Sequence, residues 1–131
     1  MTRSIVVDAS VVVDLLGRFE PEPLDELLLG GSFALAAPEL LTIEALQAFR
    51  RLERAGAMTS PSSSLIMNLQ ALPIAYYPHE SLIAQVWSLR ENLTAYDATY
   101  VALARELDAP LFTRDRKLAA APVQGIEILV R

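Results

Sequence analysis

Four acidic residues stand at places in the sequence where solubility alone does not explain a carboxylate. Asp8 directly follows the apolar run 5–7, and Asp115 stands just after a second apolar run. Glu44 and Asp97 fall within helical patterns, beside apolar stripes. Ionised carboxylates near a core are costly unless a positive charge neutralises them. A divalent cation could neutralise all four, so we expect a metal site if the fold brings them together.

The donor atoms that the chain offers narrow the choice of metal. There is no cysteine, and His79 is the one histidine, which excludes a thiolate or histidine-rich zinc site. Carboxylate oxygens suit hard cations, so we expect Mg²⁺ or Mn²⁺. We expect Asp8 and Asp97 to be the principal ligands. Glu44 and Asp115 would hold waters or a second ion, and all four are candidate catalytic residues.

Apolar runs and helix boundary signals predict the elements that must position these acids. The expected strands are 4–7, 33–36, 73–77, 111–113 and 127–130. The expected helices are 9–16, 21–29, 39–55, 79–92, 95–108, 116–121 and one that runs from a cap at 60–62 to about 72. Strands that alternate with helices predict an α/β fold, in which a small parallel sheet is covered by helices on both faces.

Sites in open parallel sheets form beyond the carboxyl ends of the strands, near the switch in strand order. Asp8 and Asp115 each follow a strand, so both should point to that edge. Either residue could equally be a helix N-cap, a position that favours aspartate. Asp97 stands at capping-box spacing from Thr94. Tyr100 and other apolar residues share the helix face of Asp97, which predicts that its carboxylate points into the protein body.

Three further sets of polar residues are ambiguous. Glu44 lies on the border of its helix's apolar stripe, where a surface ion pair with Arg51 is an alternative to a site role. Ser10 is either a second hydroxyl of the site or a polar residue of a first helical turn. The basic run 114–117 is either a solvated turn or a phosphate contact. The candidate substrate-binding residues are Ser10, Thr113, Arg114 and Arg116.

Composition sets the broad class of protein. With 131 residues, 53% of them hydrophobic, we expect a single domain over 1–131 with a real core. The net charge of −5 excludes a protein that holds nucleic acid by bulk charge. No apolar stretch reaches the ~20 residues of a membrane span. Too few uncharged residues precede Asp8 for a signal-peptide core, and the lack of cysteine suits the cytoplasm, where we expect the protein.

Four segments, in this order and spacing, resemble the PIN-domain ribonucleases, specifically the VapC-type toxins of bacterial toxin–antitoxin pairs. They are 5–10 (IVVDAS), 38–44 (PELLTIE), 93–104 (LTAYDATYVALA) and 110–115 (PLFTRD). The resemblance implies an α/β/α sandwich over a small parallel sheet. It maps the family's acids onto Asp8, Glu44, Asp97 and Asp115. One departure is Gln47, because the family usually has asparagine three positions after the glutamate.

The resemblance also implies an activity and partners. The activity would be a Mg²⁺- or Mn²⁺-dependent endoribonuclease, with a water activated for in-line attack on an RNA phosphodiester. The partners would be an RNA substrate, a small antitoxin whose C-terminal segment covers the active site, and a second copy of the chain in a homodimer.

Two other classes of protein compete with this interpretation. In an aspartyl-nucleophile phosphohydrolase or receiver-like domain, Asp8 would be the nucleophile, but such phosphatases usually place a second aspartate where this chain has Ser10. A receiver-like domain carries its phosphorylated aspartate after a central strand. Glu44 does not match that position, because it lies in a helical pattern. A non-catalytic PIN-like interaction module is the second alternative, and the presence of all four acids argues against it. A DNA substrate is a variant of the main hypothesis.

Overall fold

The computed structural model describes residues 3–17, 28–123 and 125–130. Within these ranges strands alternate with helices, as the sequence pattern predicted. The strands are β1 (Arg3–Val7), β2 (Phe33–Pro38), β3 (Ile74–Tyr77), β4 (Leu111–Thr113) and β5 (Ile128–Val130). The helices are α1 (Ala9–Gly17), α3 (Leu40–Arg54), α4 (Ser62–Ala71), the 3-10 helix η1 (Glu80–Leu82), α5 (Ile83–Ser88), α6 (Ala95–Leu107) and α7 (Arg116–Ala119). The helix expected over 21–29 lies, up to residue 27, outside the described residues.

All strand pairings in the described sheet are parallel, and the strand order is β3-β2-β1-β4-β5. The chain therefore builds outward from β1 through β2 to β3, and then returns to add β4 and β5 on the other side. The switch in strand order falls between β1 and β4, where Val7 pairs with Phe112. Asp8 and Asp115 follow these two strands, so both lie at the edge where sites form in this class of sheet.

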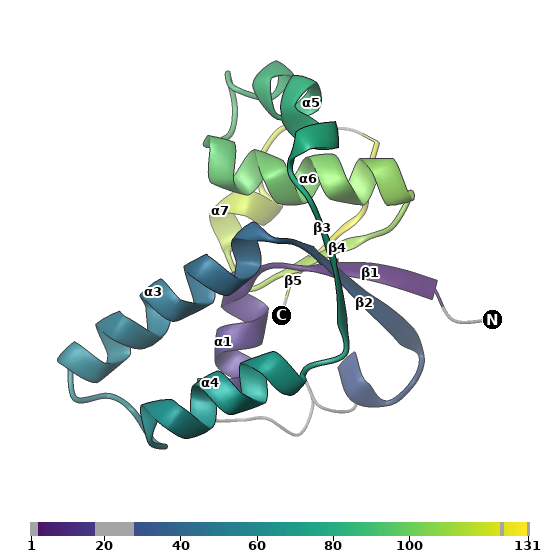
Figure 1. Ribbon diagram of the computed structural model, residues 1–131. Coiled ribbons are helices and arrows are strands. Elements are labelled where there is room, and N and C mark those ends of the chain that lie inside the picture. Colours follow the sequence, from purple (N-terminus) through teal and green to yellow (C-terminus); the bar gives the residue numbers. More distant parts are fainter. Residues whose placement is uncertain (1–2, 18–27, 124, 131) are drawn as a thin grey trace.

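Helices cover both faces of the sheet, which confirms the expected α/β/α arrangement. In Figure 1, α1, α3 and α4 lie on one side of the strands, and α5, α6 and α7 lie on the other. The strand residues 5–7 are fully buried for this reason, and they do not alternate with polar residues. Helix α6 is buried along the whole stretch 98–104, as expected for the helix that packs against β1, β2 and β4.

The helix expected over 79–92 is shorter in the structure. It begins as the 3-10 helix η1, continues as α5 and ends at Ser88. Two carbonyls of this region accept hydrogen bonds from side chains, which compete there with the N–H groups of a longer helix. The Ser88 hydroxyl donates to the Gln85 carbonyl, and the Arg90 guanidinium donates to the Trp87 carbonyl. Helix α4 begins after the expected cap at 60–62, where Pro61 is the N-cap residue and makes no side-chain cap bond.

Among the described residues, no helix has the length and apolar character needed to cross a membrane.

Candidate active site

All four acids line one pocket of about 1110 Å³. Asp8 comes from the end of β1, Glu44 from α3, Asp97 from α6 and Asp115 from the end of β4. The fold therefore gathers side chains that stand up to 107 positions apart in the chain. As they are placed, no three acidic or histidine side chains among the described residues form a ready-made metal cage. The four acids therefore line one pocket, but as they are placed their oxygens do not converge on a single point.

Asp8 is the most buried of the four acids, with 6% of its surface exposed. Its Oδ1 accepts hydrogen bonds from the Ser10 hydroxyl (2.5 Å) and from the Val11 N–H (3.2 Å). Its Oδ2 accepts a hydrogen bond from the Thr113 hydroxyl. The bond from Val11 makes Asp8 the N-cap of α1, so the capping alternative is correct and coexists with a place in the pocket.

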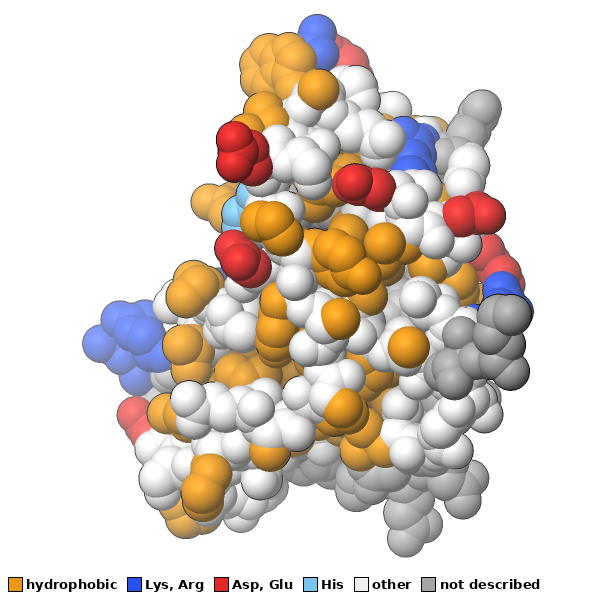
Figure 2. Space-filling view, turned by 45° about the vertical axis from the view of Figure 1, so that its right-hand side comes forward, with side chains coloured by type: hydrophobic (Ala, Val, Ile, Leu, Met, Phe, Trp, Pro, Cys, Tyr) orange, Lys and Arg blue, Asp and Glu red, His pale blue; other side chains and the backbone are white. Residues whose placement is uncertain are grey.

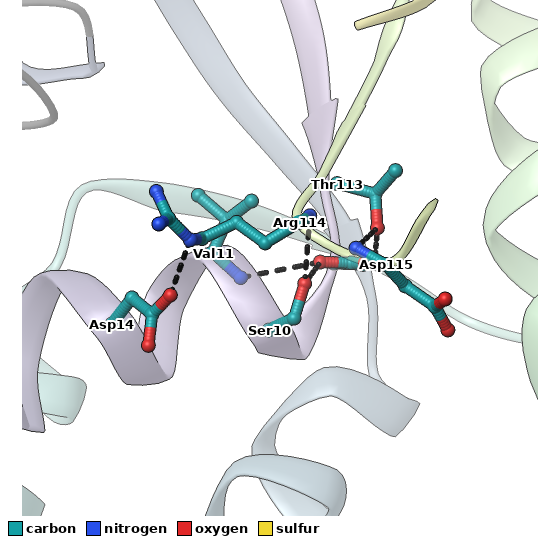
Figure 3. Close-up of polar contacts among 7 residues, drawn as sticks. Ser10, Val11, Asp14, Thr113, Arg114 and Asp115 are labelled. Carbon is teal, nitrogen blue, oxygen red and sulfur yellow. Dashed lines mark hydrogen bonds and ion pairs between the residues drawn. The ribbon is translucent and has the colours of Figure 1, made fainter. Parts of the chain in front are cut away.

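The hydroxyls of Ser10 and Thr113 join Asp8 to the loop after β4. The Arg114 N–H donates to the Ser10 hydroxyl oxygen (3.0 Å), and the Asp115 N–H donates to the Thr113 hydroxyl oxygen (2.9 Å). Figure 3 shows Ser10, at the start of α1, facing the loop that carries Arg114. Both hydroxyls thus orient Asp8, and their expected contact with substrate stays a prediction.

Asp115 caps α7, as the capping alternative proposed. Its Oδ1 accepts from the Lys117 N–H (2.9 Å) and, at 3.4 Å, from the Leu118 N–H. The same residue lines the pocket. A helix N-terminus favours a negative charge, so the cap and the site role reinforce each other.

The two candidate arginines are placed differently. Arg114 lines the pocket, and its Nε forms an ion pair with Asp14 of α1, as Figure 3 shows. Arg116 lies on α7, is exposed and is not among the residues that line the pocket. Of the basic run 114–117, only Arg114 therefore reaches the site directly.

Asp97 lies in the first turn of α6. Its N–H donates to the Thr94 hydroxyl oxygen (3.2 Å), which makes Thr94 the N-cap of α6. This is the first of the two bonds of the capping box that the spacing suggested. Asp97 is half-buried and lines the pocket, which confirms that it faces inward rather than toward bulk solvent.

Glu44 contacts a residue that sequence reasoning did not connect with it. The Tyr100 hydroxyl donates to Glu44 Oε1 (2.5 Å), and Tyr100 is only 1% exposed. Within the described part of the chain Glu44 forms no ion pair with Arg51, so the surface-pair alternative is wrong. Burial, and then the hydrogen bond to Glu44, raise the pKa of Tyr100, so the hydroxyl remains a donor. The only sequence signal was that Tyr100 shares a helix face with Asp97.

The acids are electrostatically coupled. Burial raises the pKa of Asp8, and the charge of Asp115 raises it further, while hydroxyl and backbone donors lower it. Burial raises the pKa of Glu44, as do the charges of Asp97 and Asp8. Burial also raises the pKa of Asp97, together with the charges of Asp115 and Asp8. The charges of Asp8, Asp97 and Asp115 thus each disfavour the charged form of at least one neighbouring acid.

This donor set fits a hard divalent cation. Carboxylates from four elements converge in the pocket, which Arg51 and Arg114 also line, and Mg²⁺ and Mn²⁺ prefer carboxylate oxygens. A cation among the carboxylates would favour the charged forms that burial and neighbouring acids disfavour in Asp8, Glu44 and Asp97. Gln47, which stands where the PIN-domain ribonucleases usually have asparagine, also lines the pocket and so lies within reach of the site.

Comparisons with known proteins agree with this geometry. The family model described as PIN domain matches residues 5–124. Ribonuclease VapC1 of Mycobacterium tuberculosis is 44% identical to the chain over 96% of its length and 97% of the relative's. Ribonuclease VapC3 of the same organism is 36% identical over 91% of the chain and 88% of the relative.

Solved structures give the same fold. PAE2754 from Pyrobaculum aerophilum superimposes with a TM-score of 0.68 at 25% identity, over 96% of this chain and 83% of that one. A toxin–antitoxin complex from Klebsiella pneumoniae gives a TM-score of 0.63 at 20% identity, over 95% and 99%. The chain belongs to the PIN-domain family. Within that family it is a homologue of the VapC ribonucleases.

Proposed function

We propose that this chain is a metal-dependent endoribonuclease, the toxin component of a toxin–antitoxin pair, and that it hydrolyses RNA phosphodiester bonds in the acidic pocket. The observation that carries the proposal is the convergence of Asp8, Glu44, Asp97 and Asp115, from four separate elements, on one pocket. The 44% identity to a named ribonuclease supports the same chemistry. The chain would act as one domain over 1–131.

Each acid has a proposed role toward a bound ion. Asp8 and Asp97 would be the principal ligands of Mg²⁺ or Mn²⁺, and Glu44 and Asp115 would hold waters or a second ion. Such a metal, when bound, supplies charge stabilisation at the phosphate and a more acidic water. Asp8 is fixed by three hydrogen-bond donors, so its oxygens are oriented before any ligand arrives.

The chain would hold RNA through a few local contacts rather than through a basic surface. Figure 2 shows a face on which hydrophobic and uncharged side chains predominate and basic side chains form only small, separate groups. Arg114 lines the pocket with the acids, and a substrate phosphate would replace Asp14 as its partner. Arg116, farther along α7, would contact a more distant phosphate.

The pocket wall also suits the binding of a protein partner. We place both proteins in the cytoplasm. Ile43 and Tyr96 line it and are 64% and 62% exposed. Apolar walls beside a carboxylate cluster fit an antitoxin segment that presents hydrophobic side chains and an arginine. We further propose that the toxin is a homodimer.

The activity can be tested with purified protein on matched RNA and DNA strands and on total cellular RNA. We expect cleavage of RNA with Mg²⁺ or Mn²⁺, none after chelation, and mapped ends at discrete positions. The variant Asp97→Asn should lose cleavage, whereas Glu106→Gln, an exposed position on the same helix α6, should keep it.

Two outcomes would overturn the proposal. One is cleavage that persists at full rate in the presence of a chelator. The other is preferential cleavage of the DNA strand, which would leave the metal-dependent site but change the substrate. Expression of the wild-type chain without an antitoxin should arrest growth, and expression of the Asp97→Asn variant should not.

A further inference from the structure

Tyr100 places a buried hydroxyl inside the acidic site. It lies on α6 one turn after Asp97, and its ring is packed in the core. The pocket that holds the four acids is also lined by Tyr100. A buried hydroxyl needs hydrogen-bond partners, and the partners of this one are informative.

The Tyr100 hydroxyl joins two other elements at the site. It donates to Glu44 Oε1 on α3 (2.5 Å). The backbone N–H of Ala9, the first residue of α1 and the neighbour of Asp8, lies close enough to lower the pKa of this hydroxyl. One hydroxyl on α6 therefore lies between the helix that carries Glu44 and the backbone next to Asp8.

Glu44 depends on this contact to stay in the pocket. Its charged form is disfavoured by burial and by the charges of Asp97 and Asp8. Among the described residues the Tyr100 hydroxyl is the hydrogen-bond donor to its carboxylate. A glutamate side chain without this donor is free to adopt other rotamers, so the hydrogen bond defines where its carboxylate lies.

We propose that Tyr100 is a positioning residue for Glu44. Its hydroxyl fixes Oε1 and so holds the carboxylate among the other acids, ready to take part in ion binding. The proposal rests on the proposed metal-dependent function. It adds a residue that acts through Glu44 and is not itself a ligand.

The variant Tyr100→Phe tests the proposal because it removes the hydroxyl and keeps the ring. We expect Mn²⁺ affinity, measured by calorimetry on the metal-free protein, to fall by about tenfold. In RNA cleavage, kcat should fall while KM changes little. The matched control is Tyr77→Phe, a partly buried tyrosine on β3 outside the pocket, which should bind Mn²⁺ like the wild type. Thermal unfolding of both variants would show whether stability alone has changed.

A double-mutant cycle shows whether Tyr100 acts through Glu44. In a Glu44→Ala background, removal of the Tyr100 hydroxyl should cause no further loss of Mn²⁺ affinity. Equal losses in both backgrounds, or wild-type affinity in Tyr100→Phe, would overturn the proposal. If the wild type itself bound no Mn²⁺, the proposed function would fail instead.

A second variant covers the case in which Tyr100→Phe does not fold. Ala9→Pro removes the N–H that lies beside the Tyr100 hydroxyl, at a first helical position where proline is tolerated. Mn²⁺ affinity should fall in the same direction as for Tyr100→Phe. Unchanged affinity in a folded Ala9→Pro protein would contradict the role given to this hydroxyl.

Discussion

Asp8 and Asp115 accept backbone N–H bonds at the first turns of α1 and α7 while their side chains line the pocket. Asp97 lies in the first turn of α6, where its own N–H donates to the Thr94 hydroxyl oxygen. Three acids of the site thus lie at helix N-termini, which favour negative charge. This arrangement offsets part of the electrostatic free energy that it costs to bring carboxylates together. It also fixes the backbone position of each acid.

The double role of Asp8 leads to the first prediction. Asparagine is also a good N-cap, so Asp8→Asn should keep α1 and the fold. It removes the charge that a cation needs, so the RNA cleavage rate should fall by about 100-fold or more. Initial rates and thermal unfolding test this. Asp108→Asn is the control, because this exposed residue caps the other end of α6 in a left-handed conformation that asparagine tolerates. A fully active Asp8→Asn protein would remove Asp8 from the mechanism.

The raised pKa values predict how pH affects the metal-free protein. Asp8, Glu44 and Asp97 have folded pKa values above their usual 3.8, 4.5 and 3.8. The folded state therefore holds protons that the unfolded state releases. Their contribution to stability is complete below the usual values and is lost as pH rises through the raised ones. Urea unfolding in chelator from about pH 4 to about pH 7 should show a smaller decline for Asp8→Asn than for the wild type. If the stabilities of Asp8→Asn and of the wild type declined equally over this pH range, the electrostatic coupling between Asp8 and the other acids would be refuted.

At the scale of elements, the start of α3 decides where Glu44 lies. The N–H of Leu40, at the first helical position, donates to His79 Nε2 (2.9 Å) across the space between α3 and the end of β3. The N–H of Glu39 donates to the Tyr77 carbonyl (3.0 Å) nearby. The one histidine of the chain thus satisfies a helix N-terminus.

Removal of this contact should destabilise the protein. His79→Ala leaves a helix N–H without its acceptor, which costs about 1 kcal/mol of the free energy of unfolding. Ser81→Ala is the control, since it changes an exposed side chain in the adjacent 3-10 helix. Denaturant unfolding of both variants measures the difference. Equal stability of His79→Ala and the wild type would show that water replaces the imidazole without loss.

Periodicity was sufficient for most elements but not for contacts between them. Strand β4 has the expected bounds, because an apolar run ends sharply at a turn. The helix expected over 79–92 was too long. The side chains of Ser88 and Arg90 bond to helix carbonyls, and a periodic pattern does not reveal such bonds. The same limit applies to the site: spacing along α3 suggested Arg51 for Glu44. The true partner is Tyr100, 56 positions away, which comes near only because α3 and α6 both reach the same edge of the sheet.

At the scale of the whole molecule, the sheet order explains why four distant acids meet. The reversal between β1 and β4 brings two loops together at one edge, and α3 and α6 approach that edge from opposite faces. A parallel sheet buried on both sides makes this frame rigid. The strand run 5–7 predicted burial, but the adjacency of β1 and β4 follows from topology and not from any local pattern.

Metal binding should therefore stabilise the whole fold. A cation that binds only the assembled pocket adds about 2.7 kcal/mol at 100 times its dissociation constant. The melting temperature of the wild type should rise by several degrees in millimolar Mg²⁺ or Mn²⁺. Asp97→Asn should show a smaller rise, and Glu106→Gln the same rise as the wild type. Differential scanning calorimetry measures these shifts, and an equal rise in all three proteins would indicate binding elsewhere.

The central claim is that carboxylates from four elements act as one centre for a hard cation. Calorimetric titration of Mn²⁺ into the metal-free wild type and into Asp8→Asn, Glu44→Gln, Asp97→Asn and Asp115→Asn tests it most directly. We expect saturable binding to the wild type and a weaker affinity in every variant, with the largest losses for the Asp8 and Asp97 variants. Affinities that match the wild type in all four variants, or no binding at all, would contradict it.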